Sequence, residues 1–135
     1  MIKSAVIGVG HLGRYHAEKY YKSKESELVA LVDPNPENAA KLAKKYNALY
    51  YSDYKVLPDL GVKCASVSSS TSTHFEIASW LMKNGIDVLV EKPVTVTSAE
   101  ARELNLIAKT YNRIYQAGHL ERFNPAFRAM KEVLN

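Results

Sequence analysis

The sequence contains very little cysteine and no long hydrophobic run. Cys64 is the one cysteine among 135 residues, so neither an internal disulfide nor a thiolate zinc cluster can form, and a structural thiol is expected. The absence of an 18-residue apolar run argues against a membrane span, and the first residues lack the pattern of a signal peptide. We therefore expect a cytoplasmic protein with no membrane partner and no metal site.

Acidic residues are fewer than basic ones, 14 against 18, which gives a formal net charge of +4. A basic balance can indicate nucleic-acid binding, but that function favours Lys and Arg clustered on one face. The densest group here, Lys41, Lys44 and Lys45, lies in a predicted helix and is typical of a solvated helix face. No nucleic-acid partner is therefore expected.

Short apolar runs alternate with helical patterns along the whole chain. Such runs fit strands buried on both faces of a parallel sheet, with helices as the crossovers. The predicted strands are Lys3–Val9, Leu28–Val32, Ala48–Tyr51, Ala65–Ser69, Asp87–Glu91 and Ile114–Ala117. The pattern predicts a doubly wound α/β sheet, a Rossmann fold, with six strands in the order 3-2-1-4-5-6.

The helices between these strands are predicted from apolar stripes and end signals. Thr97 and Glu100 form a capping-box signature, and Gly85 follows another stripe as a stop. The predicted helices are Tyr15–Lys22, a segment with the stripe Ala39, Leu42, Ala43 and Tyr46, His74–Asn84, the segment capped by Thr97, and Ala126–Leu134.

The first predicted strand leads into Gly8-Val9-Gly10-His11-Leu12-Gly13, a G-x-G-x-x-G motif. A bare match is weak, but this one leaves a strand and opens a helix within a βαβ unit, which is the context of a dinucleotide site. Gly8 permits the tight turn, Gly10 lets the backbone approach a pyrophosphate, and Gly13 lets the helix pack closely. The helix start offers N–H groups to the phosphates. The alternative is a glycine turn that binds nothing.

Asp33 ends the second predicted strand, 20 residues after Gly13. A carboxylate at this point can accept hydrogen bonds from ribose hydroxyls, and it would repel a 2′-phosphate. Neither Pro34 nor Asn35 supplies a cation, so NAD is predicted over NADP. Asp33 could also cap the proline-rich turn that follows, and the two roles are compatible.

Three further segments carry a resemblance to a known family. They are Ser66–His74 (SVSSSTSTH), Glu91-Lys92-Pro93, and Gly118–Pro125 (GHLERFNP). With the glycine turn, they resemble the N-terminal half of the glucose–fructose oxidoreductase, inositol dehydrogenase and rhizopine catabolism family (Gfo/Idh/MocA) over essentially the whole chain. The last segment is similar to the branch that acts on UDP-N-acetyl sugars.

The resemblance implies a set of cofactor-binding residues. The set is Gly8, Gly10, His11, Leu12, Gly13, Asp33, Ser68, Ser69, His74, Glu91 and Lys92. Glu91 would reach the nicotinamide ribose, and Lys92 would hold the substrate hydroxyl as the catalytic residue. The chain departs from the family at Ser69-Ser70, where Thr-Pro is common, so this loop lacks the fixed φ of proline.

Residue chemistry agrees with this role for Lys92, because ligands of such sheets bind at the carboxyl ends of strands, where an ammonium can stabilise alkoxide charge. The alternative is a surface lysine before a proline turn. His16 is interpreted as a partly buried histidine with satisfied hydrogen bonds, although the resemblance also allows a place near the substrate. His119 and Arg122 either contact nicotinamide or substrate or anchor their turn.

The resemblance also implies a second, α+β domain that is absent from this chain and that supplies the usual catalytic histidine and the oligomer interface. Residues 1–122 would form the dinucleotide domain, and residues 123–135 would begin the connection. The 135-residue piece would bind NAD without turnover. Phe123 and Phe127 would be left as exposed apolar surface, which favours self-association.

The whole protein would be an NAD-dependent oxidoreductase that transfers hydride between nicotinamide and a sugar, cyclitol or nucleotide-sugar carbinol, as a homo-oligomer. One alternative is a non-catalytic nucleotide-binding sensor or scaffold, which would not need Lys92. Another is an S-adenosylmethionine-dependent methyltransferase, which Gly13 and the Glu91-Lys92-Pro93 segment disfavour.

Overall fold

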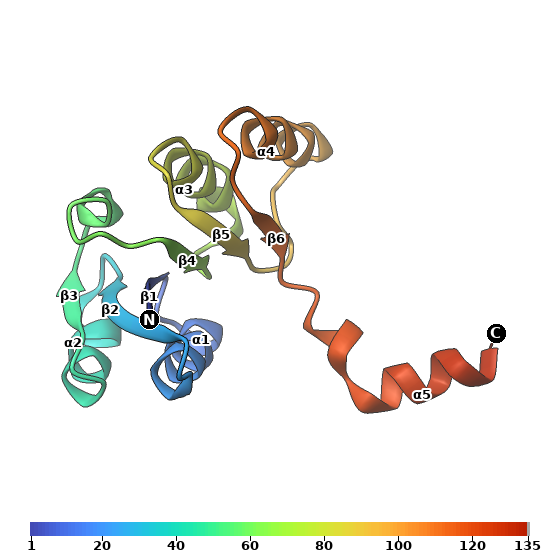
Figure 1. Ribbon diagram of the computed structural model, residues 1–135, viewed down its shortest axis with the longest axis horizontal. Coiled ribbons are helices and arrows are strands. Elements are labelled where there is room, and N and C mark those ends of the chain that lie inside the picture. Colours follow the sequence, from blue (N-terminus) through green and yellow to red (C-terminus); the bar gives the residue numbers. More distant parts are fainter. Residues whose placement is uncertain (135) are drawn as a thin grey trace.

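The computed structural model describes residues 1–134 and contains one sheet in which all five strand pairings are parallel (Figure 1). The strand order is β3-β2-β1-β4-β5-β6, which confirms the predicted fold class, strand number and order. The strands are β1 (Ile2–Ile7), β2 (Ser26–Val32), β3 (Leu49–Tyr51), β4 (Cys64–Val67), β5 (Asp87–Val90) and β6 (Tyr115–Ala117).

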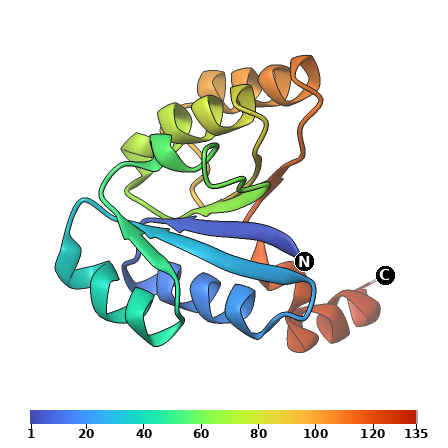
Figure 2. The ribbon, with the colours of Figure 1, turned by 60° about the vertical axis from the view of Figure 1, so that its left-hand side comes forward.

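Helices cover both faces of the sheet: α1 and α2 lie on one side, and α3 and α4 lie on the other (Figures 1 and 2). The helices are α1 (His11–Lys22), α2 (Pro36–Lys45), α3 (Thr71–Lys83), α4 (Ser98–Thr110) and α5 (Pro125–Leu134). Two short 3-10 turns, η1 (Tyr54–Val56) and η2 (Leu120–Phe123), were not predicted from the sequence.

Each face of the sheet has its own apolar core. Leu81, Met82 and Leu104 are fully buried between α3, α4 and the sheet, while Val6 and Leu31 are fully buried on the side of α1 and α2. Each such side chain contributes about 1.5–3 kcal/mol through burial. The apolar runs of β1, β2 and β4 are therefore buried on both faces, whereas β5 buries only alternate residues.

The structure contains the capping box predicted at the start of α4. The backbone N–H of Glu100 donates to Thr97 Oγ1 (3.2 Å), and the backbone N–H of Thr97 donates to Glu100 Oε2 (3.0 Å). Asn35 caps α2 with a single hydrogen bond, because its side-chain oxygen accepts the N–H of Glu37 at 2.9 Å. These two helix starts are closed by their own side chains.

Helix α5 projects away from the sheet, and its residues are exposed throughout Pro125–Leu134 (Figure 1). Phe123 is 62% exposed and Phe127 is 44% exposed, so the prediction of exposed aromatic surface is confirmed. Within residues 1–134, no helix combines the length and the apolar character needed to cross a membrane.

Candidate functional site

The turn from β1 to α1 places its three glycines in different surroundings. Gly8 has a φ of +83°, and a Cβ at Gly8 would collide with the backbone of Ser69. A Cβ at Gly13 would collide with the carbonyl oxygen of Gly8, whereas a Cβ at Gly10 would meet nothing within 4 Å. The turn and the helix packing therefore require Gly8 and Gly13, and Gly10 borders open space.

Helix α1 starts differently from α2 and α4. Its N-cap is Gly10, which provides no side-chain hydrogen bond, and the first turn carries no acidic residue. The positive end of the helix dipole and the first-turn amides therefore remain for a ligand or solvent. A phosphate or diphosphate is the ligand that such a start favours.

Asp33 follows β2 and joins the glycine turn to the next loop. The N–H groups of Val9 and Asn35 donate to its two carboxylate oxygens, each at 2.8 Å, and the residue is only 6% exposed. Asp33 thus caps the proline-rich turn that follows it, a role that the sequence had left open. Each carboxylate oxygen keeps further lone-pair capacity for a hydroxyl donor.

The exposed part of Asp33 borders a cavity of about 370 Å³, which we call the Asp33 cavity. It is lined by Gly8, Gly10, Asp33, Pro34, Asn38, Ser68, Ser69 and Ser70. Residues from the ends of β1, β2 and β4 thus meet around one space. That space lies at the carboxyl ends of the parallel strands, where open α/β sheets bind ligands.

The serine-rich loop after β4 is held by its own hydroxyl groups in place of a proline. Ser68 Oγ donates to the carbonyl of Gly8 at 2.8 Å, and Thr73 Oγ1 donates to the carbonyl of Ser70 at 2.7 Å. Because the Thr73 proton is used there, Ser69 Oγ donates to Thr73 Oγ1 at 2.8 Å. Ser68 and Ser69 therefore have defined positions on the wall of the Asp33 cavity.

His74 lies buried between two loops at the carboxyl ends of the strands. It is 1% exposed, and its ring nitrogens lie 2.9 Å from the carbonyl oxygen of Ser69 and 3.0 Å from that of Pro93. The ring is turned into the protein and is absent from the lining of the Asp33 cavity. His74 thus fixes the loop after β4 to the loop after β5, and its contact with a cofactor stays a prediction.

Glu91 and Lys92 follow β5 and face different environments. Glu91 is 2% exposed, its Oε1 lies 2.8 Å from His16 Nε2, and its Oε2 accepts the backbone N–H of Lys92 at 3.1 Å. Gly118 packs over the carboxylate, since a Cβ there would lie 3.2 Å from Glu91 Cδ. Glu91 in this arrangement supports the backbone of Lys92, and its contact with a nicotinamide ribose stays a prediction.

Lys92 itself is exposed and borders a second cavity of about 370 Å³, the Lys92 cavity. Its lining comes from the start of α1 and from the segment after β6, and consists of Leu12, Lys92, Gly118, His119, Leu120, Glu121, Arg122 and Phe127. His119 and Arg122 thus share a cavity with Lys92, as the sequence analysis allowed.

His16 belongs to a partly buried chain of hydrogen bonds, which the sequence did not predict in full. His16 Nδ1 lies 3.3 Å from Ser66 Oγ, which lies 3.0 Å from the hydroxyl of Tyr20. Burial raises the pKa of Tyr20 to about 12, so its hydroxyl stays protonated at neutral pH. The interpretation of His16 as a partly buried, satisfied histidine is confirmed, and the spacing of His16 and Tyr20 on one face of α1 was the available signal.

No group of three His, Cys, Asp or Glu side chains within residues 1–134 is arranged to hold a metal ion. Cys64 is half-buried, and burial raises the pKa of its thiol. A raised thiol pKa lowers the thiolate fraction at neutral pH, which fits the structural thiol expected for this residue.

Comparison with known proteins gives a consistent result. Residues 2–119 match the family model GFO_IDH_MocA, described as "Oxidoreductase family, NAD-binding Rossmann fold". The chain is 35% identical over 132 residues to the UDP-N-acetylglucosamine 3-dehydrogenase of Acidithiobacillus ferrooxidans, covering 98% of this chain and 41% of that protein. It is 32% identical over 137 residues to the scyllo-inositol 2-dehydrogenase (NAD(+)) of Bacillus subtilis, covering 99% of this chain and 40% of that protein.

Solved structures agree with these relatives. The Acidithiobacillus ferrooxidans enzyme superposes with a TM-score of 0.89 over 98% of this chain and 43% of its own, at 35% identity. GenD2 from gentamicin A biosynthesis, solved in complex with NAD, superposes with a TM-score of 0.83 at 29% identity. The match covers 87% of this chain and 34% of the GenD2 chain. The chain therefore spans about two-fifths of the length of the curated relatives that it matches.

Proposed function

The chain belongs to the Gfo/Idh/MocA family of oxidoreductases, and from this premise we propose that it binds NAD(H) across the carboxyl ends of its parallel strands. The observation that carries the proposal is the open space at Gly10, in front of a helix start without a side-chain cap and beside Asp33. The amides of Gly10, His11 and Leu12 would hold the diphosphate there.

Asp33 is the proposed ligand of the adenosine ribose. Its carboxylate is held by two backbone N–H groups, so the oxygens are already oriented before a ribose hydroxyl arrives. Its negative charge favours NAD over NADP, because a 2′-phosphate brought next to it would be repelled. Ser68 and Ser69 would line the remaining wall of this part of the site.

The nicotinamide end is proposed to lie in the Lys92 cavity, since Leu12 joins that cavity to the start of α1. Bound nicotinamide supplies a hydride donor or acceptor. The Lys92 ammonium would hold the substrate hydroxyl and stabilise negative charge on its oxygen as the proton leaves. Glu91 would support this geometry through its hydrogen bond from the Lys92 backbone N–H.

For the whole protein we propose hydride transfer between nicotinamide and a carbinol carbon of a sugar, cyclitol or nucleotide sugar. The substrates named for the two relatives, UDP-N-acetylglucosamine and scyllo-inositol, support these classes. Residues 1–122 would form the dinucleotide domain, and residues 123–135 would begin the connection to a further domain in a homo-oligomer. This chain by itself would bind NAD(H) without turnover.

Titration of the chain with NADH, followed by the fluorescence of the nicotinamide, tests the proposal. We expect saturable binding, and we expect Gly10→Ala to weaken it about tenfold or more, because the added methyl group enters the space proposed for the diphosphate. The thermal midpoint of Gly10→Ala should match that of the parent, since the Cβ meets no protein atom within 4 Å. A flat response of the parent chain at millimolar NADH would contradict the proposal.

A further inference from the structure

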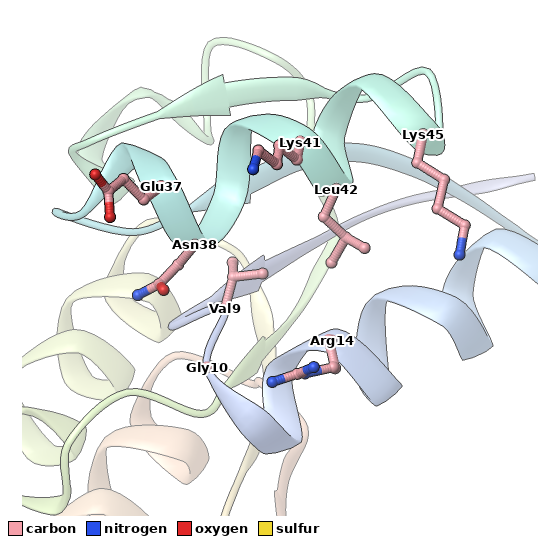
Figure 3. Close-up of a pocket in the computed structure, with 8 residues that line it drawn as sticks. All are labelled: Val9, Gly10, Arg14, Glu37, Asn38, Lys41, Leu42 and Lys45. Carbon is pink, nitrogen blue, oxygen red and sulfur yellow. The ribbon is translucent and has the colours of Figure 1, made fainter.

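Helix α1 has two faces with different surroundings. Figure 3 shows Arg14 on the face toward α2, beside a cavity that adjoins the proposed cofactor site at Gly10. That face belongs to the site already described. His16 and Tyr20 are four positions apart and so share another side of the helix, where they lie 3.3 Å and 3.0 Å from the hydroxyl oxygen of Ser66 in β4. The proposed function uses no residue of this second face.

The hydrogen bonds of the second face form a directed chain that ends at Glu91. A carboxylate can only accept, so the 2.8 Å contact between His16 Nε2 and Glu91 Oε1 requires the ring proton on Nε2. In the neutral ring Nδ1 is then an acceptor, and Ser66 Oγ donates to it. Ser66 Oγ accepts in turn from Tyr20, whose hydroxyl keeps its proton because burial raises the pKa of Tyr20 to about 12. One donor thus meets one acceptor at each contact of the chain.

This chain holds Glu91 in one orientation. Its Oε1 accepts from His16 and its Oε2 accepts the backbone N–H of Lys92 at 3.1 Å, while Gly118 packs over the carboxylate. Glu91 is 2% exposed, so water has little access to replace a lost donor. An unpaired oxygen on a buried carboxylate is costly, so without His16 the carboxylate would turn toward another donor. The hydrogen bond from Lys92 to Glu91 therefore depends on His16.

Lys92 lies between two fixed points of the backbone. Its own N–H is bound to Glu91, and the carbonyl oxygen of the next residue, Pro93, lies 3.0 Å from His74 Nδ1. The Lys92 side chain is exposed and flexible, so the position of its backbone limits where the ammonium can lie. A displacement of about 1 Å at a reacting group can lower turnover about a hundredfold. The two fixed points therefore affect the chemistry proposed for Lys92.

We propose that His16 is a positioning residue for Lys92: its Nε2–H holds the Glu91 carboxylate, which in turn holds the Lys92 backbone. The inference rests on the function proposed for Lys92. Both ring nitrogens of His16 are bound to protein groups, so His16 acts without touching cofactor or substrate. Its influence on the substrate passes through Glu91 and Lys92.

The first test locates the ring proton of His16 in the parent chain. NMR spectra of the histidine ring nitrogens at about pH 8, where an ordinary histidine is neutral, distinguish a protonated from an unprotonated nitrogen. The signals of His16 are identified by their absence in His16→Gln. We expect a protonated Nε2. An unprotonated Nε2 would overturn the inference, because Glu91 would then receive no hydrogen bond from His16.

Two amides at position 16 separate the donor from the bulk of the ring. A Gln side chain places its N–H group near the position of Nε2, whereas the shorter Asn places it near that of Nδ1. In the whole protein we expect His16→Asn to lower kcat about tenfold or more and His16→Gln to stay within about threefold of the parent. The KM of the dinucleotide should change less than about twofold in either variant. Equal losses of kcat in the two variants would overturn the inference and indicate that only the packing of the ring matters.

A double-mutant cycle shows whether His16 acts through Lys92. In the Lys92→Ala background, His16→Asn should lower kcat further by less than about twofold, because no ammonium is left to misplace. The ring-nitrogen spectra of the parent chain keep the inference testable where His16→Asn does not fold. The same loss of kcat in both backgrounds would overturn the inference while the proposed function stands. Full turnover of Lys92→Ala with normal NADH binding would overturn the catalytic role of Lys92 and this inference together.

Discussion

The Asp33 carboxylate holds the glycine turn and the loop after β2 through hydrogen bonds, and it also borders the Asp33 cavity. Val9 and Asn35 donate to its two oxygens from either side, so the side chain is held in one orientation. A polar group that is already ordered loses little rotamer entropy when a ligand binds, which favours affinity. The structural role of Asp33 therefore supports its proposed role as a ribose ligand.

Lys92 is the residue that separates an oxidoreductase from a module that only binds a nucleotide. Its side chain is exposed, and Glu91 supports its backbone rather than its ammonium. We expect Lys92→Ala to leave the stability of the chain and its NADH affinity within about twofold of the parent. In the whole protein, the same change should lower kcat by about 10²–10³-fold, because the alkoxide loses its stabilising charge.

The measurement for Lys92→Ala pairs an NADH titration with steady-state kinetics of the complete protein. Leu120→Ala, a change in the same cavity at a residue with no proposed chemical role, indicates how far disturbance of the lining alone affects turnover. Unchanged turnover in Lys92→Ala with normal NADH binding would contradict the catalytic role and favour a sensor or scaffold.

The site residues that could be predicted from sequence are those whose reasons are local. Gly8 and Gly13 are required by one turn, and Asp33 ends the strand that follows in the same βαβ unit. The ring contacts of His74 and the chain from Glu91 through His16 to Ser66 depend on strand order and side-chain orientation instead. His16 and Glu91 are 75 positions apart in the sequence, so no local pattern reports their contact.

At the scale of elements, helix starts were predicted only where a capping signature or an apolar pattern begins with the helix. Every helix was predicted, three of them from apolar stripes, but α1 begins at His11 and α3 at Thr71, before the predicted starts at Tyr15 and His74. The first turns of both helices are largely polar or exposed, so the stripe begins later than the helix. The 3-10 turns η1 and η2 span three and four residues and are too short to show a periodic pattern.

Helix α4 allows a direct test of capping energetics. Thr97→Ala removes the side-chain acceptor of the Glu100 N–H, and we expect it to lower the free energy of unfolding by about 1 kcal/mol. Ser98→Ala is the control, since this residue is the first of the helix rather than its cap. Urea denaturation measures both changes, and an equal effect of the two variants would contradict the contribution assigned to the capping box.

At the scale of the whole molecule, α1 to α4 each contribute buried residues to the packing against the sheet, while α5 contributes none. The fold was predictable because each strand and each crossover helix has its own apolar pattern in the sequence. In addition, the crossover connections between parallel strands are right-handed. The position of α5 was not predictable, because an amphipathic helix does not indicate which surface covers it. The chain spans about two-fifths of its relatives, and α5 lies exposed along Pro125–Leu134.

The exposed apolar surface of η2 and α5 leads to the last prediction. Leu120, Phe123, Phe127, Met130 and Val133 are each between 44% and 85% exposed. Because burial of such surface is favourable, we expect the chain to self-associate, with a sedimentation coefficient that rises with concentration. Phe127→Ser combined with Met130→Ser should reduce this association, whereas Leu106→Ser on α4, which removes an exposed apolar side chain elsewhere, should leave it unchanged. A monomeric profile that is independent of concentration would show that this surface does not drive self-association.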